Sequence, residues 1–273
     1  MLSGKTIFET CPQNTGNLDG GDIMKRFITI CQVEFVLFIR DFFGFFFTLV
    51  FPTMMLVLFG SIYGNNPIYL GAEVGMIDVS VPAYCVMVIG VTGLMSLPLT
   101  LAEYKEKKIY KRFDATPVGK KSIMVAQVCI NVVMTFVGFL VLLFVGLVVY
   151  QVQIRGDFFS ILLAMLISVA AMFSIGFFFT AVARDTKITN LLCYLSYFLM
   201  IFLSGATMPD MLFPESVRTI ANLLPMTYAV DLMQGIFSGY SLTNYITELI
   251  VLLGVTLFFT IIGAMLYRKK DWA

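Results

Sequence analysis

The stretch EYKEKKIYKRFDATPVGKK, residues 103–121, decides how this chain folds. Its 19 residues contain seven of the chain's 18 Lys and Arg. Uncharged sequence lies on both sides of it, at residues 79–102 and at residues 122–154. Each of these runs is longer than the roughly 20 residues that a helix needs to cross a bilayer. A densely charged segment between two spans cannot lie in hydrocarbon, so we expect it to be exposed at the membrane surface.

The composition of the whole chain is that of an integral membrane protein. Of its 273 residues, 59% are hydrophobic and only 13% are charged, whereas soluble domains have about 25% charged residues. The mean hydropathy is +0.91. His is absent, which removes the commonest metal ligand and the commonest general base at neutral pH. The five Cys have no C-x-x-C spacing, so we interpret them as small apolar residues and expect no metal site.

The N-terminal part of the chain divides into two regions. Residues 1–22 have no sustained periodicity and predict a flexible tail. Residues 23–41 predict an amphipathic helix in the membrane interface, because polar residues recur there at helical spacing among apolar ones. These polar residues are Lys25, Arg26, Thr29 and Gln32. The alternative is the start of a long first span, although the charged pair Arg40 and Asp41 favours an interfacial helix.

The remainder, residues 42–273, predicts an all-α transmembrane domain with six spans. We expect the spans at about 42–63, 79–102, 122–150, 158–183, 188–203 and 248–267. Residues 204–240 interrupt the pattern with repeated Gly and Pro and two apolar pieces of about ten residues each. Such pieces are too short to cross and too apolar for a solvated loop, so they predict re-entrant or interfacial half-helices. The Phe cluster at 42–47 suits either a lipid-facing surface or a lipophilic path.

The distribution of Lys and Arg predicts the orientation. With six spans both termini lie on one side, and 16 of the 18 Lys and Arg then fall on that side. The opposite side has only Arg155 and Arg218. The positive-inside rule therefore places both termini and the charged stretch in the cytoplasm, and residues 204–240 outside.

Motifs of the common catalytic classes are missing from the chain. The stretch Gly119-Lys120-Lys121-Ser122 resembles the end of a nucleotide-binding loop, but Asp114 replaces the first Gly and Lys121 interrupts the Gly-Lys-Ser order. No G-x-S-x-G, H-E-x-x-H or zinc-ligand pattern occurs. The predicted spans contain no carboxylate relay of the kind that proton-driven transporters use. We therefore expect neither an enzyme nor an ion-coupled transporter.

The charged stretch itself is compatible with a helix over about 103–116. Glu103 and Lys107 have the i,i+4 spacing of an ion pair, and Pro117 and Gly119 would end the helix. Ile109, Tyr110 and Phe113 form a small apolar stripe. A generic positive-inside loop would not need such a stripe, so the stripe favours a helix that inserts into a groove of another protein.

Two motifs resemble the membrane subunits of the type-two family of ATP-binding-cassette (ABC) exporters. Residues 104–118, YKEKKIYKRFDATPV, are similar to the family's coupling helix and its R-L-x-A-T-P-V ending. Lys108 and Ile109 stand where that family usually has Gly-Thr. Residues 204–231, SGATMPDMLFPESVRTIANLLPMTYAVD, resemble the family's segment before the last span. Gln234 stands where an Arg is common.

The resemblance implies how the protein works with partners. Two permease subunits, identical or not, would pair in the bilayer, and each would dock an ABC ATPase subunit. ATP and Mg would bind that ATPase, with no cofactor and no nucleic acid on this chain. The implied ATPase-coupling residues are Glu103, Tyr104, Lys105, Glu106, Lys107, Ile109, Tyr110, Arg112 and Phe113. The implied outer gate residues are Gly205, Pro209, Pro214, Pro225, Tyr228 and Asp231.

These features predict the permease of an ATP-driven exporter in the cytoplasmic membrane of a bacterium. Uncharged, Phe-rich and Met-rich span interiors favour an amphipathic or lipophilic substrate, such as a drug, antibiotic, peptide or lipid. A polysaccharide exporter is one alternative, and a membrane scaffold or assembly factor without transport is another. A membrane-embedded enzyme would have to use Tyr228 and Asp231, the candidate polar groups near the outer face.

Overall fold

A computed structural model describes residues 20–66, 75–114, 119–207 and 214–269. Within these ranges the chain is helical and has no strand, which confirms the all-α prediction. The helices in order are α2 (Gly20–Arg40), α3 (Phe42–Phe45), η1 (Phe46–Val50), α4 (Phe51–Tyr63), α5 (Met76–Gly90), η2 (Val91–Ser96), α6 (Leu97–Glu106), α7 (Ile109–Asp114), α8 (Gly119–Tyr150), α9 (Phe158–Val182), α10 (Thr186–Leu203), α11 (Glu215–Ala221), α12 (Pro225–Phe237), η4 (Leu242–Tyr245) and α13 (Ile246–Lys269).

Six helical stretches in the described part are long and apolar enough to cross a membrane, as predicted. We call them spans one to six: Phe42–Tyr63, Met76–Glu106, Ser122–Tyr150, Phe158–Val182, Thr186–Leu203 and Leu242–Tyr267. Span two begins before the predicted residue 79 because Asp78 lies in the first turn of α5 and caps the N-terminus of that helix. Its carboxylate accepts a hydrogen bond from the Gly75 amide at the helix N-terminus. Span two also continues past residue 102, since a helix can leave the membrane without ending.

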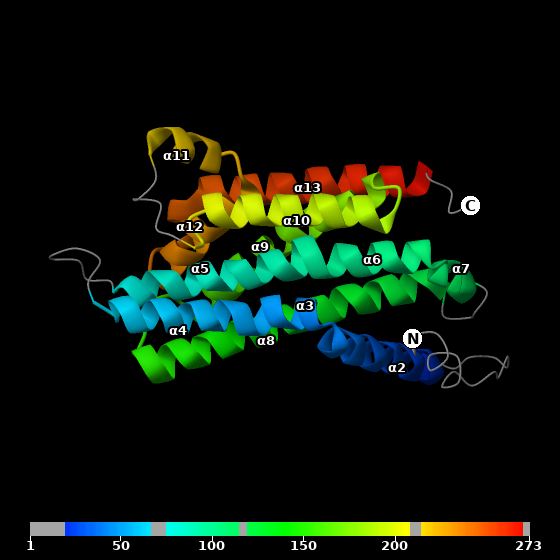
Figure 1. The fold of residues 1–273 in the computed structure, drawn as a ribbon, viewed down its shortest axis with the longest axis horizontal. Helices are drawn as coiled ribbons and strands as arrows, with labels where there is room; N and C mark the ends of the chain where they lie inside the picture. Colours follow the sequence, from blue (N-terminus) through cyan, green and yellow to red (C-terminus); the bar gives the residue numbers. More distant parts are fainter. Residues whose placement is uncertain (1–19, 67–74, 115–118, 208–213, 270–273) are drawn as a thin grey trace.

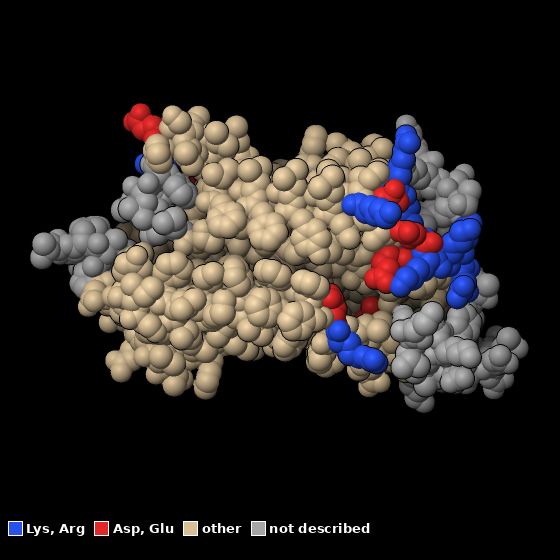
Figure 2. Space-filling view, in the orientation of Figure 1, with Lys and Arg blue, Asp and Glu red and all other residues tan. Residues whose placement is uncertain are grey.

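The helices lie side by side with their connections at two ends (Figure 1). One end, which we call the charged end, carries α2, α7, the turn between α9 and α10, and the last turn of α13. Lys and Arg side chains gather there in Figure 2. The other end, which we call the opposite end, carries α11, the start of α5 and the turn between α8 and α9. Both termini of the described chain lie towards the charged end.

Span two is the centre of the bundle. In its most apolar window 89% of the residues are buried, compared with 11% in span six. Span four crosses it at very close range: a Cβ atom on Gly176 would lie 2.0 Å from the Gly93 carbonyl oxygen. Only a residue without a side chain allows two backbones to approach in this way.

Spans one and two each contain a π-helical turn, η1 and η2, and these two turns contact each other. Pro52 and Pro98 follow directly after them, in the first turn of α4 and of α6. Proline cannot donate a backbone hydrogen bond and collides with the carbonyl of the preceding turn. The wider π turn accommodates both prolines, so span one continues as a helix through Pro52.

Helix α2 is separate from span one. It ends at Arg40, Asp41 has an extended backbone with φ −77° and ψ 97°, and α3 begins at Phe42. Figure 1 shows α2 leaving the line of α3 and α4 at an angle. The chain between spans five and six also contains two short helices, α11 and α12, as the composition of 204–240 suggests. Most of α12 is buried, and it packs against α5, α9 and α13.

Candidate coupling site and adjoining cavity

The charged stretch forms two helices where the sequence predicted one. Helix α6 ends at Glu106, and α7 begins at Ile109. The break lies at Lys108, whose φ of +54° is in the left-handed region. Lys and Glu favour helix throughout this stretch, so local propensity gives no sign of a break. The predicted i,i+4 ion pair between Glu103 and Lys107 is present.

The apolar stripe of α7 packs against the protein's own bundle. Tyr110 is 2% exposed and Phe113 8%, and Ile109 packs against the same core. The Tyr110 hydroxyl donates to Gln127 Oε1 of α8 at 3.0 Å. Burial raises the pKa of Tyr110, so its hydroxyl stays protonated as a donor. The stripe was expected to enter a groove of another protein. It fills the groove beside α8 instead, because the bend at Lys108 turns α7 back onto its own chain.

The exposed surface of the charged stretch is therefore made of charged side chains. We call this surface the charged patch; its residues are Glu103, Glu106, Lys107, Lys108, Lys111 and Arg112. Lys105 is partly buried, and its Nζ donates to the Ala183 carbonyl oxygen at 3.5 Å. A partner that docks here would meet both signs of charge within two short helices.

Besides the Lys105 contact, hydrogen bonds among the described residues tie the charged stretch to three other helices. The Tyr104 hydroxyl donates to Glu34 Oε1 of α2 at 3.0 Å. Tyr110 binds α8 as described. The Thr186 amide, at the start of α10, donates to Glu106 Oε2 at 3.1 Å. Glu106 was predicted to face a partner, and here it also caps the first turn of span five, where a negative charge is favourable.

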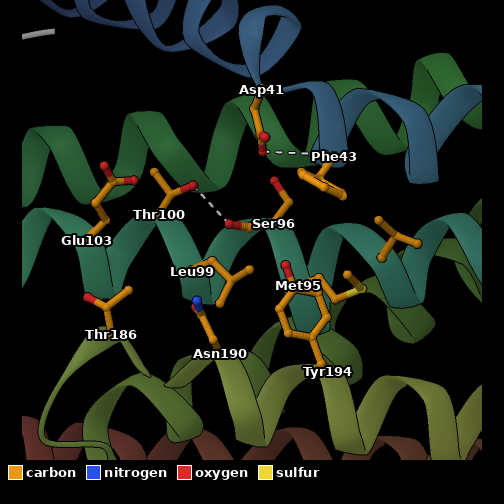
Figure 3. A pocket seen from close by; sticks show the side chains of 12 residues that line it. Asp41, Phe43, Met95, Ser96, Leu99, Thr100, Glu103, Thr186, Asn190 and Tyr194 are labelled. Carbon is orange, nitrogen blue, oxygen red and sulfur yellow. Dashed lines mark hydrogen bonds between the residues drawn. The ribbon is translucent and has the colours of Figure 1, made fainter. Parts of the chain in front are cut away.

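A cavity of about 230 Å³ lies beside the charged stretch. Its walls come from the start of span one, from the end of span two and from the start of span five (Figure 3). The apolar lining consists of Phe43, Gly44, Val91, Met95, Leu99 and the ring of Tyr194. The polar lining consists of Asp41, Ser96, Thr100, Glu103, Thr186 and Asn190.

Some polar groups of the cavity are already paired. Asp41 Oδ2 accepts from the Gly44 amide at 3.2 Å, and the Thr100 hydroxyl donates to the Ser96 carbonyl oxygen at 2.9 Å. Among the described residues, Asn190 Oδ1 and Thr186 Oγ1 are inaccessible to solvent and have no hydrogen-bond partner. The lining thus combines apolar surface with polar side chains and two carboxylates, which suits an amphipathic molecule.

This cavity was not predicted from the sequence. Its lining comes from three segments that are far apart in the chain, and each segment taken alone looks like the end of an ordinary span. Glu34 was also missed. The one available signal was a single carboxylate among Val33, Phe35 and Val36 on a helix whose other polar residues form a separate stripe.

The predicted outer residues lie near the opposite end. Gly205 has a left-handed φ of +78° just after α10. Pro214 precedes α11, and Pro225 occupies the first turn of α12.

The Tyr228 hydroxyl donates to the Asn222 carbonyl oxygen at 2.7 Å, and Asp231 is exposed on α12. Pro209 lies outside the described residues. Within the part of the chain that is described, these residues shape the connection between spans five and six and do not line the cavity.

The fold and the site together define a polytopic membrane protein with a charged surface at one end. No group of three or more possible metal ligands occurs among the described residues. Comparison with protein families identifies the chain further. The ABC-2 type transporter family matches residues 25–238, so the chain belongs to this family. No curated protein sequence matched the chain.

Membership of the family settles the general role of the chain. ABC-2 proteins are the membrane components of ABC transporters and are not themselves catalytic. They work with ABC ATPase subunits in a bilayer. The matched region contains spans one to five, the charged stretch, the cavity lining and both short helices α11 and α12.

Proposed function

We propose that this chain is the permease subunit of an ATP-driven exporter and that its ATPase docks on the charged patch. The observation that carries the proposal is the set of three ties from the charged stretch to α2, α8 and α10. A surface loop without a mechanical role does not need bonds to three separate helices. ATP and Mg would bind the partner ATPase, and this chain would contribute the membrane path.

The ties suggest how force would reach the substrate path. The cavity is lined by spans one, two and five. The hydrogen bond between Glu106 of α6 and Thr186 of α10 joins span two to span five. Displacement of the charged stretch by ATPase closure would therefore move both cavity walls together. Such a push shifts a two-state equilibrium only if the ATPase contacts the charged patch differently in the two states.

The cavity supports an amphipathic or lipophilic substrate, such as a drug, antibiotic, peptide or lipid. Its volume of about 230 Å³ holds a small molecule or part of a chain, and its lining is half apolar and half polar. A long polysaccharide is a less suitable occupant, because sugar polymers need a continuous polar path. Substrate would enter at the charged end, on the cytoplasmic side according to the positive-inside rule, and leave past Gly205, Pro225 and Asp231.

The assembly would contain a second permease subunit, identical to this chain or not. Spans one, five and six are buried to 22%, 28% and 11% in their most apolar windows. This leaves broad apolar faces for lipid and for the second subunit. A scaffold or assembly factor without transport is the alternative function, and co-purification of an ATPase decides between them.

The test uses charge reversal on the charged patch in the full-length chain, purified from native membranes. Lys111→Glu with Arg112→Glu changes exposed side chains without disturbing buried Tyr110 and Phe113. Glu215→Lys reverses an exposed charge at the opposite end and is the matched control. We expect an ATPase to co-purify with the wild type and with the control, and its recovery to fall at least tenfold with the double variant.

Two outcomes would overturn the proposal. Equal recovery of the ATPase with all three proteins would show that docking occurs elsewhere. Recovery of no ATPase from any of them, at matched expression, would favour the scaffold.

A further inference from the structure

Glu34 is a buried carboxyl group at the contact between α2 and the end of span two. It is 6% exposed, although its neighbours Phe35 and Val36 on the same helix are exposed. Its Oε1 accepts one hydrogen bond, from the Tyr104 hydroxyl of α6 at 3.0 Å. A buried carboxylate usually needs several donors or a cation to be stable as an ion.

The described side chains around Glu34 do not supply a positive charge. The titratable groups that face it are Tyr104 of α6, Tyr110 of α7 and Cys31 of α2, with Cys129 of α8 next to Cys31. None of these is a cation. Among the described side chains, no Lys or Arg forms an ion pair with Glu34, and Lys107 is paired with Glu103. Burial raises the pKa of Glu34 from 4.5 to about 7, and the Tyr104 hydrogen bond offsets this only in part.

Helix α2 is connected to span one by a break in the helix, and its Phe38 packs against Ile130 and Met134 of α8. It joins span one through Asp41 alone, whose extended backbone interrupts the helix. The Asp41 side chain accepts a hydrogen bond from the Gly44 amide and so caps the N-terminus of α3. This cap does not depend on the position of α2. Asp41, Phe43 and Gly44 also line the cavity, so the hinge of α2 lies in the cavity wall.

We propose that the Glu34–Tyr104 contact is a proton-sensitive latch, which holds α2 against the end of span two and releases it when Glu34 loses its proton. The latch itself follows from the contact, the burial and the hinge. Its consequence for transport rests on the proposed function, since release would loosen one of the three ties of the charged stretch and free the hinge beside the cavity.

The direction of the pH effect follows from the two states of Glu34. In docked α2 the pKa is raised, and in released α2 the carboxyl is solvated with its ordinary value. Docking is therefore strongest below about pH 4.5 and weakens as pH rises towards 7. The released-to-docked ratio rises roughly tenfold per pH unit in this range and becomes constant above about pH 7. Near neutral pH the latch responds to small changes.

The experiment measures hydrogen exchange of the backbone amides of residues 28–40 at pH 5 and pH 8. The full-length chain is used in lipid nanodiscs, with any co-purified ATPase, and rates are referred to the intrinsic exchange rate at each pH. We expect protection of α2 to fall more than tenfold from pH 5 to pH 8 in the wild type. Glu34→Gln keeps an acceptor for Tyr104 without a charge, so its protection should be the same at both pH values.

Glu215→Gln, which removes an exposed carboxylate on α11, is the matched control and should behave as the wild type. A second variant covers the case that Glu34→Gln does not fold. Tyr104→Phe removes the hydrogen bond that holds Glu34 to α6, so protection of α2 should fall below that of the wild type, and by more at pH 8, where Glu34 is ionised and the bond is charge-assisted.

Three results would overturn the latch: protection in the wild type that does not change with pH, an unchanged pH dependence in Glu34→Gln, or protection of α2 in Tyr104→Phe that equals that of the wild type at pH 8. Because the readout is the position of α2, these results do not depend on whether an ATPase docks on the charged patch. Failure of the latch and failure of the exporter proposal are therefore distinguishable.

Discussion

The two ends of the bundle each bury one carboxylate, and they stabilise it differently. At the opposite end Asp78 accepts three hydrogen bonds: from the Gly75 amide at 2.9 Å, the Gln153 amide at 3.0 Å and Asn65 Nδ2 at 3.1 Å. At the charged end Glu34 accepts one. Three donors hold the Asp78 carboxylate to the neighbouring loops, whereas the single donor to Glu34 makes a weaker contact. The end at which we propose that the ATPase docks thus has the weaker internal contact.

The strongest test of this comparison removes the Asp78 contact. Asp78→Ala leaves the buried Gly75 amide and the partly buried Gln153 amide without this partner, and an unsatisfied buried group costs about 1–3 kcal/mol. We expect a loss of about 4 kcal/mol in the free energy of unfolding, measured by thermal unfolding in nanodiscs. Asp78→Asn keeps an acceptor of the same shape and should lose less than half as much. Equal losses would show that packing and not hydrogen bonding holds this end.

The next test concerns the part that connects the two ends. Gly176→Ala places a Cβ atom 2.0 Å from the Gly93 carbonyl oxygen, and backbone at this position cannot yield as a flexible side chain would. We expect spans two and four to separate, with a loss of about 3 kcal/mol in the same unfolding measurement. Gly254→Ala is the control, because no atom lies within 4 Å of its Cβ position. A neutral Gly176→Ala would mean that the bundle adapts and that the ends are not rigidly connected.

A smaller effect should appear at Glu34 and should grow as the pH rises from about 4.5 to about 7. Glu34→Gln removes the cost of burying a charge, so it should stabilise the protein at pH 8 by about 2 kcal/mol and have almost no effect at pH 4.5. Thermal unfolding of both proteins at the two pH values measures this difference. Stabilisation that is the same at both pH values would assign the effect to packing.

The smallest effect is expected at the bend of the charged stretch. Lys108 has a left-handed φ of +54°, which costs a residue other than glycine about 1 kcal/mol. Lys108→Gly should therefore stabilise the protein by up to about 1 kcal/mol. Lys111→Gly, within α7, should destabilise it by a similar amount. If Lys108→Gly also destabilises the protein, the contacts of the Lys108 side chain contribute more free energy than its backbone strain costs.

The spans were predictable from the sequence because a long uncharged run rarely forms anything other than a membrane helix. The bounds of span one, 42–63, and of span three, 122–150, agree with the structure for this reason. The sequence does not show which surface an apolar helix face packs against. The stripe of Tyr110 and Phe113 was recognised, but its periodicity is the same whether it packs on α8 or on another protein.

Features that depend on several segments were also missed. The contact of Glu34 depends on Tyr104, which lies 70 residues later in the chain. The cavity forms only where three spans pack together. The bend at Lys108 was hidden by residues that all favour helix. The family's usual Gly at that position is the one sequence feature consistent with a left-handed backbone there.

The π-helical turn η2 sets the rotational phase of span two. A π turn accommodates one residue more than an α turn, and each added residue rotates the rest of a helix by about 100°. Residues before Val91 and after Ser96 therefore follow two different angular registers within one span. Removing a single residue from 91–96 would leave a straighter helix with the same composition, yet Thr100, Glu103 and Tyr104 would point to other neighbours. A change of length in the middle of the membrane would thus misdirect side chains at the charged end without altering any of them.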